Sequence, residues 1–138
     1  MTERTIHLSR LDHDRLKTLI DDVLRSETRD VEHVVALANE MRRAVVLPPG
    51  EIPGDVITMR SRARLVDLDT HEVFEYTLVF PQEAEITTGK ISVLAPVGTA
   101  MLGYRIGDEF EWEVPTGVRR LRVDALPYQP EAAGDYHL

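Results

Sequence analysis

The stretch "RARLVDLDTHEVFEYTLVF", residues 62–80, changes the hydrophobic period of the chain from that of a helix to that of a strand. On both sides of the central "DTHE", apolar and polar residues follow a period of two, which is typical of half-buried strands. Asp69 and Thr70 supply side chains that favour a tight turn. The stretch therefore predicts an antiparallel β-hairpin.

Further strands are predicted towards the C-terminus. In "EFEWEV", residues 109–114, three apolar residues alternate with three glutamates, so one face should be buried and the other charged. "PTG" predicts a turn into "VRRLRVDAL", residues 118–126. Between the strands, "APVGTAMLG" predicts a short helix that ends at Gly103. From Leu126 onward, two prolines and a glycine predict a tail without regular structure, which Tyr128 and Tyr136 could anchor.

The first 47 residues follow a helical period instead. A first helix should begin after Ser9 as N-cap, with Asp12 as its acidic partner. A second helix should run on to Pro48. Their apolar stripes are Leu16, Leu19, Ile20, Val23 and Leu24 in the first helix, and Val31, Val34, Val35, Ala38, Met41 and Val45 in the second. Two amphipathic helices joined by a tight turn predict an antiparallel hairpin.

These patterns predict an α+β fold. A short antiparallel helical hairpin over residues 1–47 should precede a twisted, mostly antiparallel sheet with one short helix over residues 48–138. The boundary lies in "LPPGEIPGD", residues 47–55, where proline and glycine interrupt both patterns.

Composition narrows the possible functions. The net charge of -8 argues against attraction to nucleic-acid backbones and favours a basic protein surface as partner. The absence of cysteine excludes disulfides and thiolate chemistry. The N-terminal "MTERTIHLSR" lacks the apolar core of a secretory signal, and no apolar run is long enough to span a membrane. We therefore expect a soluble, cytoplasmic protein that makes no contact with membranes.

Several motifs together resemble a known family. Residues 67–117, from "DLDTHE" through "GKISVLAPVGTAMLG" to "PTG", resemble the C-terminal domain of Gre-type transcript cleavage factors. "DVITMRSRARL" (55–65), "SVLAPVGTAMLG" (92–103) and the final "YQPEAAGDYHL" (128–138) resemble the Rnk family, the regulators of nucleoside diphosphate kinase. The resemblance covers nearly the whole chain in its organisation, and it implies an FKBP-like shape for the sheet.

The resemblance implies bacterial RNA polymerase as the partner. In such factors the C-terminal domain grips the rim of the secondary channel and the helical hairpin points into it, so competition with other secondary-channel factors is expected. The residues that the resemblance places against the polymerase are Ser92, Leu94, Ala95, Pro96 and Val97. Gre factors often carry an acidic residue where this chain has Leu94, so the contact here should be more apolar.

The residues of this segment also have a purely structural interpretation. Pro96 suits the first turn of a helix, and Val93, Leu94 and Val97 suit a core. In an extended strand Leu94 points away from the face of Val93, which makes Leu94 the better candidate for a contact.

The connection between the two predicted helices is acidic. "RSETRDVEH", residues 25–33, contains Glu27, Asp30 and Glu32, which could hold Mg²⁺ or simply cap a helix. In the Gre factors that the chain resembles, a D-x-x-E pair on longer arms carries metal to the polymerase active centre. Here the order is reversed, and an arm from Arg10 to Arg25 extends only about 24 Å. We therefore interpret the three as the capped, channel-facing tip of a short hairpin, with no metal and no catalytic role.

No other motif predicts catalysis or a cofactor. The histidines lack zinc-site spacing, and "TTGK" at 87–90 lacks the pattern of a phosphate-binding loop. Arg60, Arg62 and Arg64 alternate in "RSRAR", which should place all three guanidinium groups on one face of a strand. These arginines and a second group could form a basic strip or pair with a row of glutamates on a neighbouring strand, and pairing is favoured for most of them. The arginines are Arg60, Arg62, Arg64, Arg119, Arg120 and Arg122, and the glutamates are Glu109, Glu111 and Glu113.

Three hypotheses follow. The first is a non-catalytic factor that binds RNA polymerase at the secondary channel and modulates elongation, without sequence-specific binding to nucleic acid. The second is an active transcript cleavage factor that uses Glu27 and Asp30. The third is a prolyl isomerase or chaperone, although the chain has only one tryptophan, three phenylalanines and four tyrosines to build an aromatic pocket.

Overall fold

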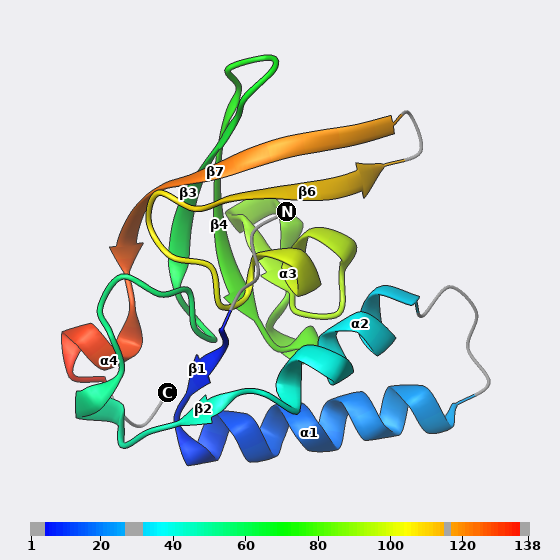
Figure 1. The fold of residues 1–138 in the computed structure, drawn as a ribbon, viewed down its shortest axis with the longest axis vertical. Coiled ribbons are helices and arrows are strands. Elements are labelled where there is room, and N and C mark those ends of the chain that lie inside the picture. Colours follow the sequence, from blue (N-terminus) through cyan, green and yellow to red (C-terminus); the bar gives the residue numbers. More distant parts are fainter. Residues whose placement is uncertain (1–4, 27–31, 115–116, 136–138) are drawn as a thin grey trace.

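The computed structural model describes residues 5–26, 32–114 and 117–135. It contains helices and strands, as an α+β fold requires, with three short 3₁₀ turns (Figure 1). The helices are α1 (Arg10–Arg25), α2 (Glu32–Met41), α3 (Pro96–Met101) and α4 (Pro130–Ala133), and the 3₁₀ turns are η1 (Pro49–Glu51), η2 (Pro81–Glu83) and η3 (Ile86–Thr88). The strands are β1 (His7–Leu8), β2 (Val45–Val46), β3 (Arg62–Asp67), β4 (Val73–Val79), β5 (Lys90–Ser92), β6 (Glu109–Val114) and β7 (Gly117–Tyr128).

Five strands form one sheet in the order β5-β4-β3-β7-β6. The predicted hairpin is confirmed, because β3 and β4 pair antiparallel with Leu65 opposite Phe74. The β6–β7 pair is also antiparallel, whereas β4 and β5 run parallel. The sheet is therefore mostly antiparallel, as the sequence predicts.

Strand β7 is longer than predicted and takes in part of the expected tail. Its register with β3 shifts on both sides of Arg64, so β7 carries irregularities where it crosses the centre of the sheet. Such irregularities leave residues outside the regular hydrogen-bond ladder, which is where a strand accommodates a proline such as Pro127. The prediction of an irregular tail from Leu126 is wrong over these residues.

Helix α4 continues this ordered tail. Gln129 caps it by accepting a hydrogen bond from Ala132 N, and the same side chain donates to the carbonyl oxygens of Pro53 and Val56. The Tyr128 hydroxyl donates to Asp135, as expected of an anchor, whereas Tyr136 lies outside the described residues. The tail is therefore fastened to the loop that precedes the sheet.

Helix α1 has the predicted bounds and the predicted cap. The Ser9 hydroxyl accepts a hydrogen bond from Asp12 N, which satisfies one of the free amides at the helix start. Helix α2 stops at Met41, earlier than predicted, because Val45 and Val46 pair with His7 and Leu8 in a small parallel sheet. The assignment of Val45 to the second helix is therefore wrong.

The buried stripe of α2 also differs from the predicted one. Val34, Leu37 and Met41 are buried, whereas Val35 is 43% exposed. Leu37, absent from the predicted stripe, is completely buried. The turn predicted between α1 and α2 lies outside the described residues.

One hydrophobic core joins the helices to the sheet. Helix α2 lies between α1 and α3 and contacts both (Figure 1). The core takes Leu16 and Ile20 from α1, Leu37 from α2, and Leu65 and Leu121 from the sheet. Helix α3 covers one face of the sheet through Met101 and its neighbours, while the opposite face carries charged side chains. None of the helices in the described ranges is long and apolar enough to span a membrane.

Candidate polymerase-docking segment

The segment from Ser92 to Val97, here called the docking segment, connects the edge strand β5 to α3. Its turn is closed by hydrogen bonds from Leu94 N to Ser92 Oγ at 3.0 Å and from Ala95 N to Ser92 O at 3.0 Å. Pro96 then occupies the first turn of α3, where its missing amide hydrogen is not needed. The Ser92 side chain therefore fixes the path of the chain into the helix.

Only part of the docking segment is accessible to a partner. Pro96 is exposed, and Ser92, Leu94 and Ala95 are partly buried. Leu94 also packs against the edge of the core. Val97, like Val93, is buried in the core, with 6% of its surface exposed, so its side chain supports the segment from within. The accessible surface is thus small and apolar, centred on Pro96.

Gly98 holds this segment against the strand. A Cβ atom at this position would lie 2.1 Å from the carbonyl oxygen of Ser92, so any side chain would force α3 away from β5. Periodicity does not single out Gly98, although a glycine inside a six-residue helix is unusual because glycine has poor helix propensity. The close approach explains it.

The structure leaves the acidic tip largely undescribed. Glu27 and Asp30 lie outside the described residues. Glu32 is the first residue of α2 and is exposed, where its charge complements the positive end of the helix dipole. This position agrees with a capping role for Glu32.

The arginines form ion pairs, and the prediction of pairing with the glutamate row is confirmed in part. Arg120 and Arg122 of β7 lie opposite Glu111 and Glu109 of β6, and both glutamates act on Arg120 electrostatically. The contacts within 4 Å in the described residues are made to other carboxylates.

Arg62 and Arg64 both contact Glu75, at 3.3 and 3.4 Å. Arg60 is not part of the strand: its backbone has a φ of 65°, and its guanidinium contacts Glu83 at 3.0 Å and lies over the Phe80 ring. The prediction that Arg60 shares a strand face with the other two is therefore wrong.

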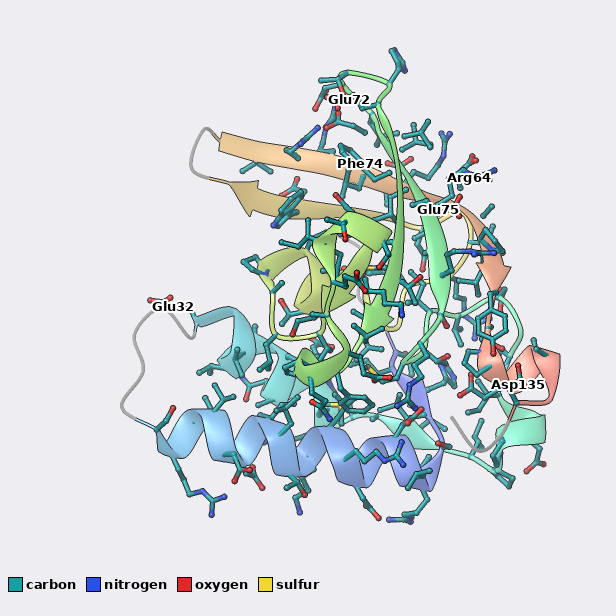
Figure 2. All side chains as sticks on the ribbon, turned by 180° about the vertical axis from the view of Figure 1, so that it is seen from behind. Glu32, Arg64, Glu72, Phe74, Glu75 and Asp135 are labelled. Atoms are coloured by element: carbon teal, nitrogen blue, oxygen red, sulfur yellow. The ribbon has the colours of Figure 1, made fainter. Side chains whose placement is uncertain are left out.

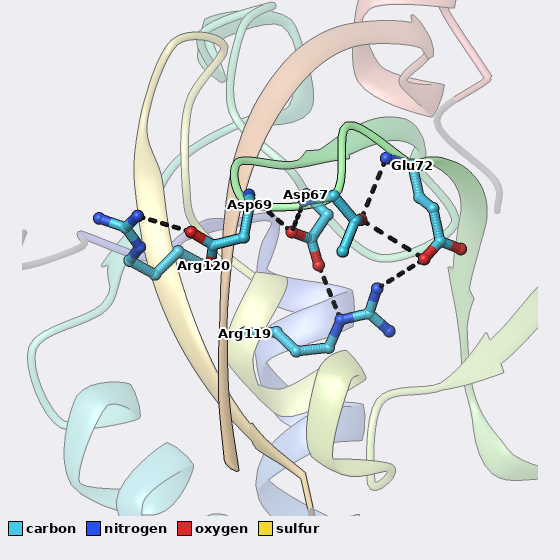
Figure 3. Close-up of polar contacts among 6 residues, drawn as sticks. Asp67, Asp69, Glu72, Arg119 and Arg120 are labelled. Atoms are coloured by element: carbon cyan, nitrogen blue, oxygen red, sulfur yellow. Dashed lines mark hydrogen bonds and ion pairs between the residues drawn. The ribbon is translucent and has the colours of Figure 1, made fainter. Parts of the chain in front are cut away.

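The second arginine group holds the turn between β3 and β4 (Figure 3). Asp67, 1% exposed, accepts hydrogen bonds from Asp69 N, Thr70 N and Arg119 Nε at 2.8, 3.0 and 2.8 Å. The Thr70 amide and the Arg119 side chain lower the pKa of Asp67 to about 2. Arg120 pairs with Asp69 at 2.8 Å, beside Arg119. This network ties the hairpin turn to β7.

A buried acidic pair lies between the N-terminal helix and the tail. Asp12 is 1% exposed, and its Oδ1 atom has no hydrogen-bond partner among the described residues. Glu131 from α4 is 8% exposed and accepts a hydrogen bond from Thr58 Oγ1 at 2.7 Å. Burial, with a further contribution from Glu131, raises the pKa of Asp12 to about 6. The sequence suggested Asp12 only as a capping partner.

Two family models match successive parts of the chain. The one described as "Transcription elongation factor, GreA/GreB, C-term" matches residues 52–128. The one described as "Rnk N-terminus" matches residues 4–47. The first therefore contains the whole docking segment, and the second contains α1, α2 and the acidic tip.

Individual relatives carry the same family names. The "Regulator of nucleoside diphosphate kinase" of Escherichia coli strain K12 is 42% identical over 139 residues, covering 100% of both chains. A "Transcription elongation factor GreA" of Clostridium botulinum is 38% identical over 90 residues, which are 65% of this chain and 56% of that factor. A solved "Prokaryotic transcription elongation factor GreA/GreB from Nitrosomonas europaea" has a TM-score of 0.76 and 39% identity, covering 90% of this chain and 100% of that one.

Proposed function

The chain belongs to the Rnk family, with an Rnk N-terminus followed by a GreA/GreB C-terminal domain, and we propose that it binds bacterial RNA polymerase at the rim of the secondary channel. There it modulates transcription elongation without cleaving RNA. The site of action would be the cytoplasm. Membership of this family itself makes the chain a regulator related to transcription elongation factors.

The docking segment is the observation that supports this proposal most directly. It presents Pro96 and the partly buried Ser92, Leu94 and Ala95 within the part of the chain that matches the GreA/GreB C-terminal family. Gly98 and the Ser92 hydrogen bonds hold these residues in place, so little conformational entropy would be lost on binding. In this proposal residues 48–138 form an FKBP-like domain that grips the rim through this segment.

Residues 1–47 would form a short helical hairpin directed into the channel. Helix α1 has 16 residues and a length of about 24 Å. Glu27, Asp30 and Glu32 would then face the channel, several turns short of the active centre, whereas acid–base chemistry requires contact at about 3 Å. Occupying the channel without cleaving RNA would also exclude other factors that enter it.

A proline substitution tests the docking. Pro96→Glu should weaken binding to core RNA polymerase at least about tenfold, because a charge enters the apolar contact. Glutamate is tolerated at the first turn of a helix, so the fold should be kept. Pro49→Glu is the matched control, since Pro49 occupies the first position of η1, away from the docking segment. Equal affinities for the two variants would contradict the proposed contact.

A cleavage assay separates the two polymerase hypotheses. The purified chain is added to a backtracked elongation complex, and RNA cleavage is compared with that of Glu27→Ala and Asp30→Ala. Binding without stimulated cleavage supports the non-catalytic proposal. If the original chain stimulates cleavage and both variants lose this activity, the transcript cleavage hypothesis replaces the non-catalytic proposal. If the chain does not bind the polymerase at all, both hypotheses are overturned.

The name of the full-length Escherichia coli relative favours a second candidate, regulation of nucleoside diphosphate kinase. We propose that any such effect arises through transcription rather than through contact with the kinase. Kinase activity measured with purified enzyme should therefore be unchanged by this chain. A change in that activity would establish direct regulation.

A further inference from the structure

The sheet face opposite α3 contains a hollow of about 360 Å³. Its polar lining comes from Arg60, Arg62, Thr77, Glu83, Lys90 and Tyr128. The volume lies within the range of small-molecule sites in proteins. Neither the docking segment nor the acidic tip accounts for it.

The strand register explains why these side chains meet. Arg62 of β3 is paired with Tyr128 of β7 on one side and with Thr77 of β4 on the other. Thr77 is in turn paired with Lys90 of β5. Paired residues on neighbouring strands point to the same face, so four side chains from four strands form one row across the sheet. Arg60, two residues before Arg62 in the chain, also lines the hollow.

The hollow is positively charged in a chain whose net charge is -8. Three of its lining side chains are cationic, and only Glu83 is anionic. Arg60 engages Glu83 through two contacts, Nε to Oε2 at 3.1 Å and NH2 to Oε1 at 3.0 Å, which leaves that carboxylate neutralised. Excess positive charge gathered in a concavity attracts anions more strongly than the same charges on a flat surface.

The remaining cations are available to a ligand. The Lys90 ammonium has no ion-pair partner within the described part of the chain, and it can donate three hydrogen bonds. Among the described residues, Arg62 forms an ion pair only with Glu75. Glu75 also pairs with Arg64, and Figure 2 shows these two on the exposed side of the β3–β4 pair. Exposed ion pairs of this kind are weak, so a multivalent anion can displace them.

We infer that this hollow binds a diphosphate or triphosphate group. Neighbouring phosphates can span the row and contact Lys90 and Arg62 together, with the Thr77 hydroxyl between them. Charge-assisted hydrogen bonds to phosphate are the strongest contacts that these side chains make. The group could belong to an inorganic polyphosphate or to a nucleotide, whose base could stack on the Tyr128 ring.

The two lysines of the chain provide a matched pair for the test. Lys90 lines the hollow, whereas Lys17 is exposed on α1. Calorimetric titration of the full chain with inorganic pyrophosphate should show binding that Lys90→Gln weakens about tenfold or more. Arg62→Gln should weaken it similarly, and Lys17→Gln, which removes the same charge elsewhere, should leave it within about twofold.

A second measurement reports the position of the ligand. After reductive ¹³C-methylation, which keeps the lysine charge, pyrophosphate should shift the Lys90 methyl signal and leave that of Lys17 in place. No detectable binding of pyrophosphate at millimolar concentration, or equal weakening by Lys90→Gln and Lys17→Gln, would overturn the inference. These measurements use no polymerase, so their outcome is independent of the proposed docking.

Comparing the affinities for tripolyphosphate and for adenosine triphosphate distinguishes an inorganic polyphosphate from a nucleotide as the source of the phosphate group. Equal affinities indicate that the site recognises the phosphate chain alone. Tighter binding of the nucleotide, abolished by Tyr128→Ala, indicates a nucleotide site. If Lys90→Gln left the affinity for the nucleotide unchanged, that result would count against this hollow as the binding site.

Discussion

At the scale of single residues, Asp12 is the least compatible with its surroundings. Its carboxylate is buried between α1 and the tail, faces the carboxylates of Glu131 and Glu83, and is only partly compensated by Arg15 and Arg60. Burial raises its pKa to about 6, above the value of about 3.9 expected in the unfolded chain. As the pH rises from about 4 to 6, the unfolded state releases this proton first, so stability should fall across this window.

Substitution of Asp12 by asparagine should remove this pH dependence. At pH 8 Asp12→Asn should be more stable than the original chain by about 2 kcal/mol, because the buried charge is absent, and at pH 4 the two should be equal. Urea unfolding between pH 4 and 8 measures this difference. Asp14→Asn changes an exposed carboxylate on the same helix and serves as the control. A variant that is less stable at pH 8 would mean that Asp12 has an ionic partner in solution.

The pKa of Asp67 is shifted in the opposite direction to that of Asp12. Hydrogen bonds from Thr70 N and Arg119 lower its pKa to about 2, so its contribution to stability is present above about pH 4 and is lost as the pH falls towards 2. Asp67→Asn should therefore lower Tm by about 5 °C or more at pH 7. The two proteins should converge near pH 2 in thermal scans by circular dichroism. Asp69→Asn, at an exposed ion pair, should have little effect at any pH.

At the scale of elements, helix α3 depends on its glycine. At a helix position with free space around it, replacing glycine by alanine stabilises a protein by about 1 kcal/mol, because alanine has the higher helix propensity. In Gly98→Ala the new methyl group would meet the Ser92 carbonyl at 2.1 Å, so the substitution should instead destabilise by about 1–3 kcal/mol. Chemical denaturation measures the sign directly. Gly54→Ala is the control, because its Cβ would meet only Ala132 Cβ at an ordinary 3.8 Å.

The elements that the sequence predicts well are those set by local rules. The Ser9 cap, the bounds of α1, the β3–β4 hairpin and the start of α3 at Pro96 all depend on residues close in the chain. The errors occur where distant segments decide. Val45 lies in β2 and pairs with His7 of β1 instead of extending α2. Strand β7 continues past Pro127 because its irregular register with β3 accommodates a proline.

The same distinction applies to the candidate site. The start of α3 at Pro96 was predictable, because proline at the first turn of a helix acts locally. The turn closed by Ser92 was not predicted, since an extended strand was expected up to Ala95. That Val97 is buried, and that Gly98 contacts β5, depends on how α3 packs against the sheet. The hollow at Lys90 could not be predicted from the sequence either, because its row of side chains depends on the register of four strands. Periodicity places a residue on a face, but it does not say which neighbours the face acquires.

At the scale of the whole molecule, the helices and the sheet share one core, so the two family-matched segments should not unfold separately. Leu37 of α2 is completely buried and belongs to the cluster that also contains Leu65 and Leu121 of the sheet. A helix that only projected into the polymerase channel would have no need of such contacts. We infer that α2 connects the part of the chain proposed to enter the channel to the sheet that carries the docking segment.

A pair of substitutions in α2 tests this coupling. Leu37→Ala should destabilise the whole molecule by about 2–5 kcal/mol, through lost apolar contacts and the cavity that remains. Val35→Ala removes an apolar side chain that is 43% exposed on the same helix and should change stability by about 0.5 kcal/mol or less. Urea unfolding followed both by far-ultraviolet circular dichroism and by the fluorescence of Trp112 in β6 should give coincident transitions that Leu37→Ala shifts together. If the helical signal moved alone while the β6 fluorescence kept its midpoint, α2 would be a separate unit, and the coupling between channel and rim would have to come from the polymerase.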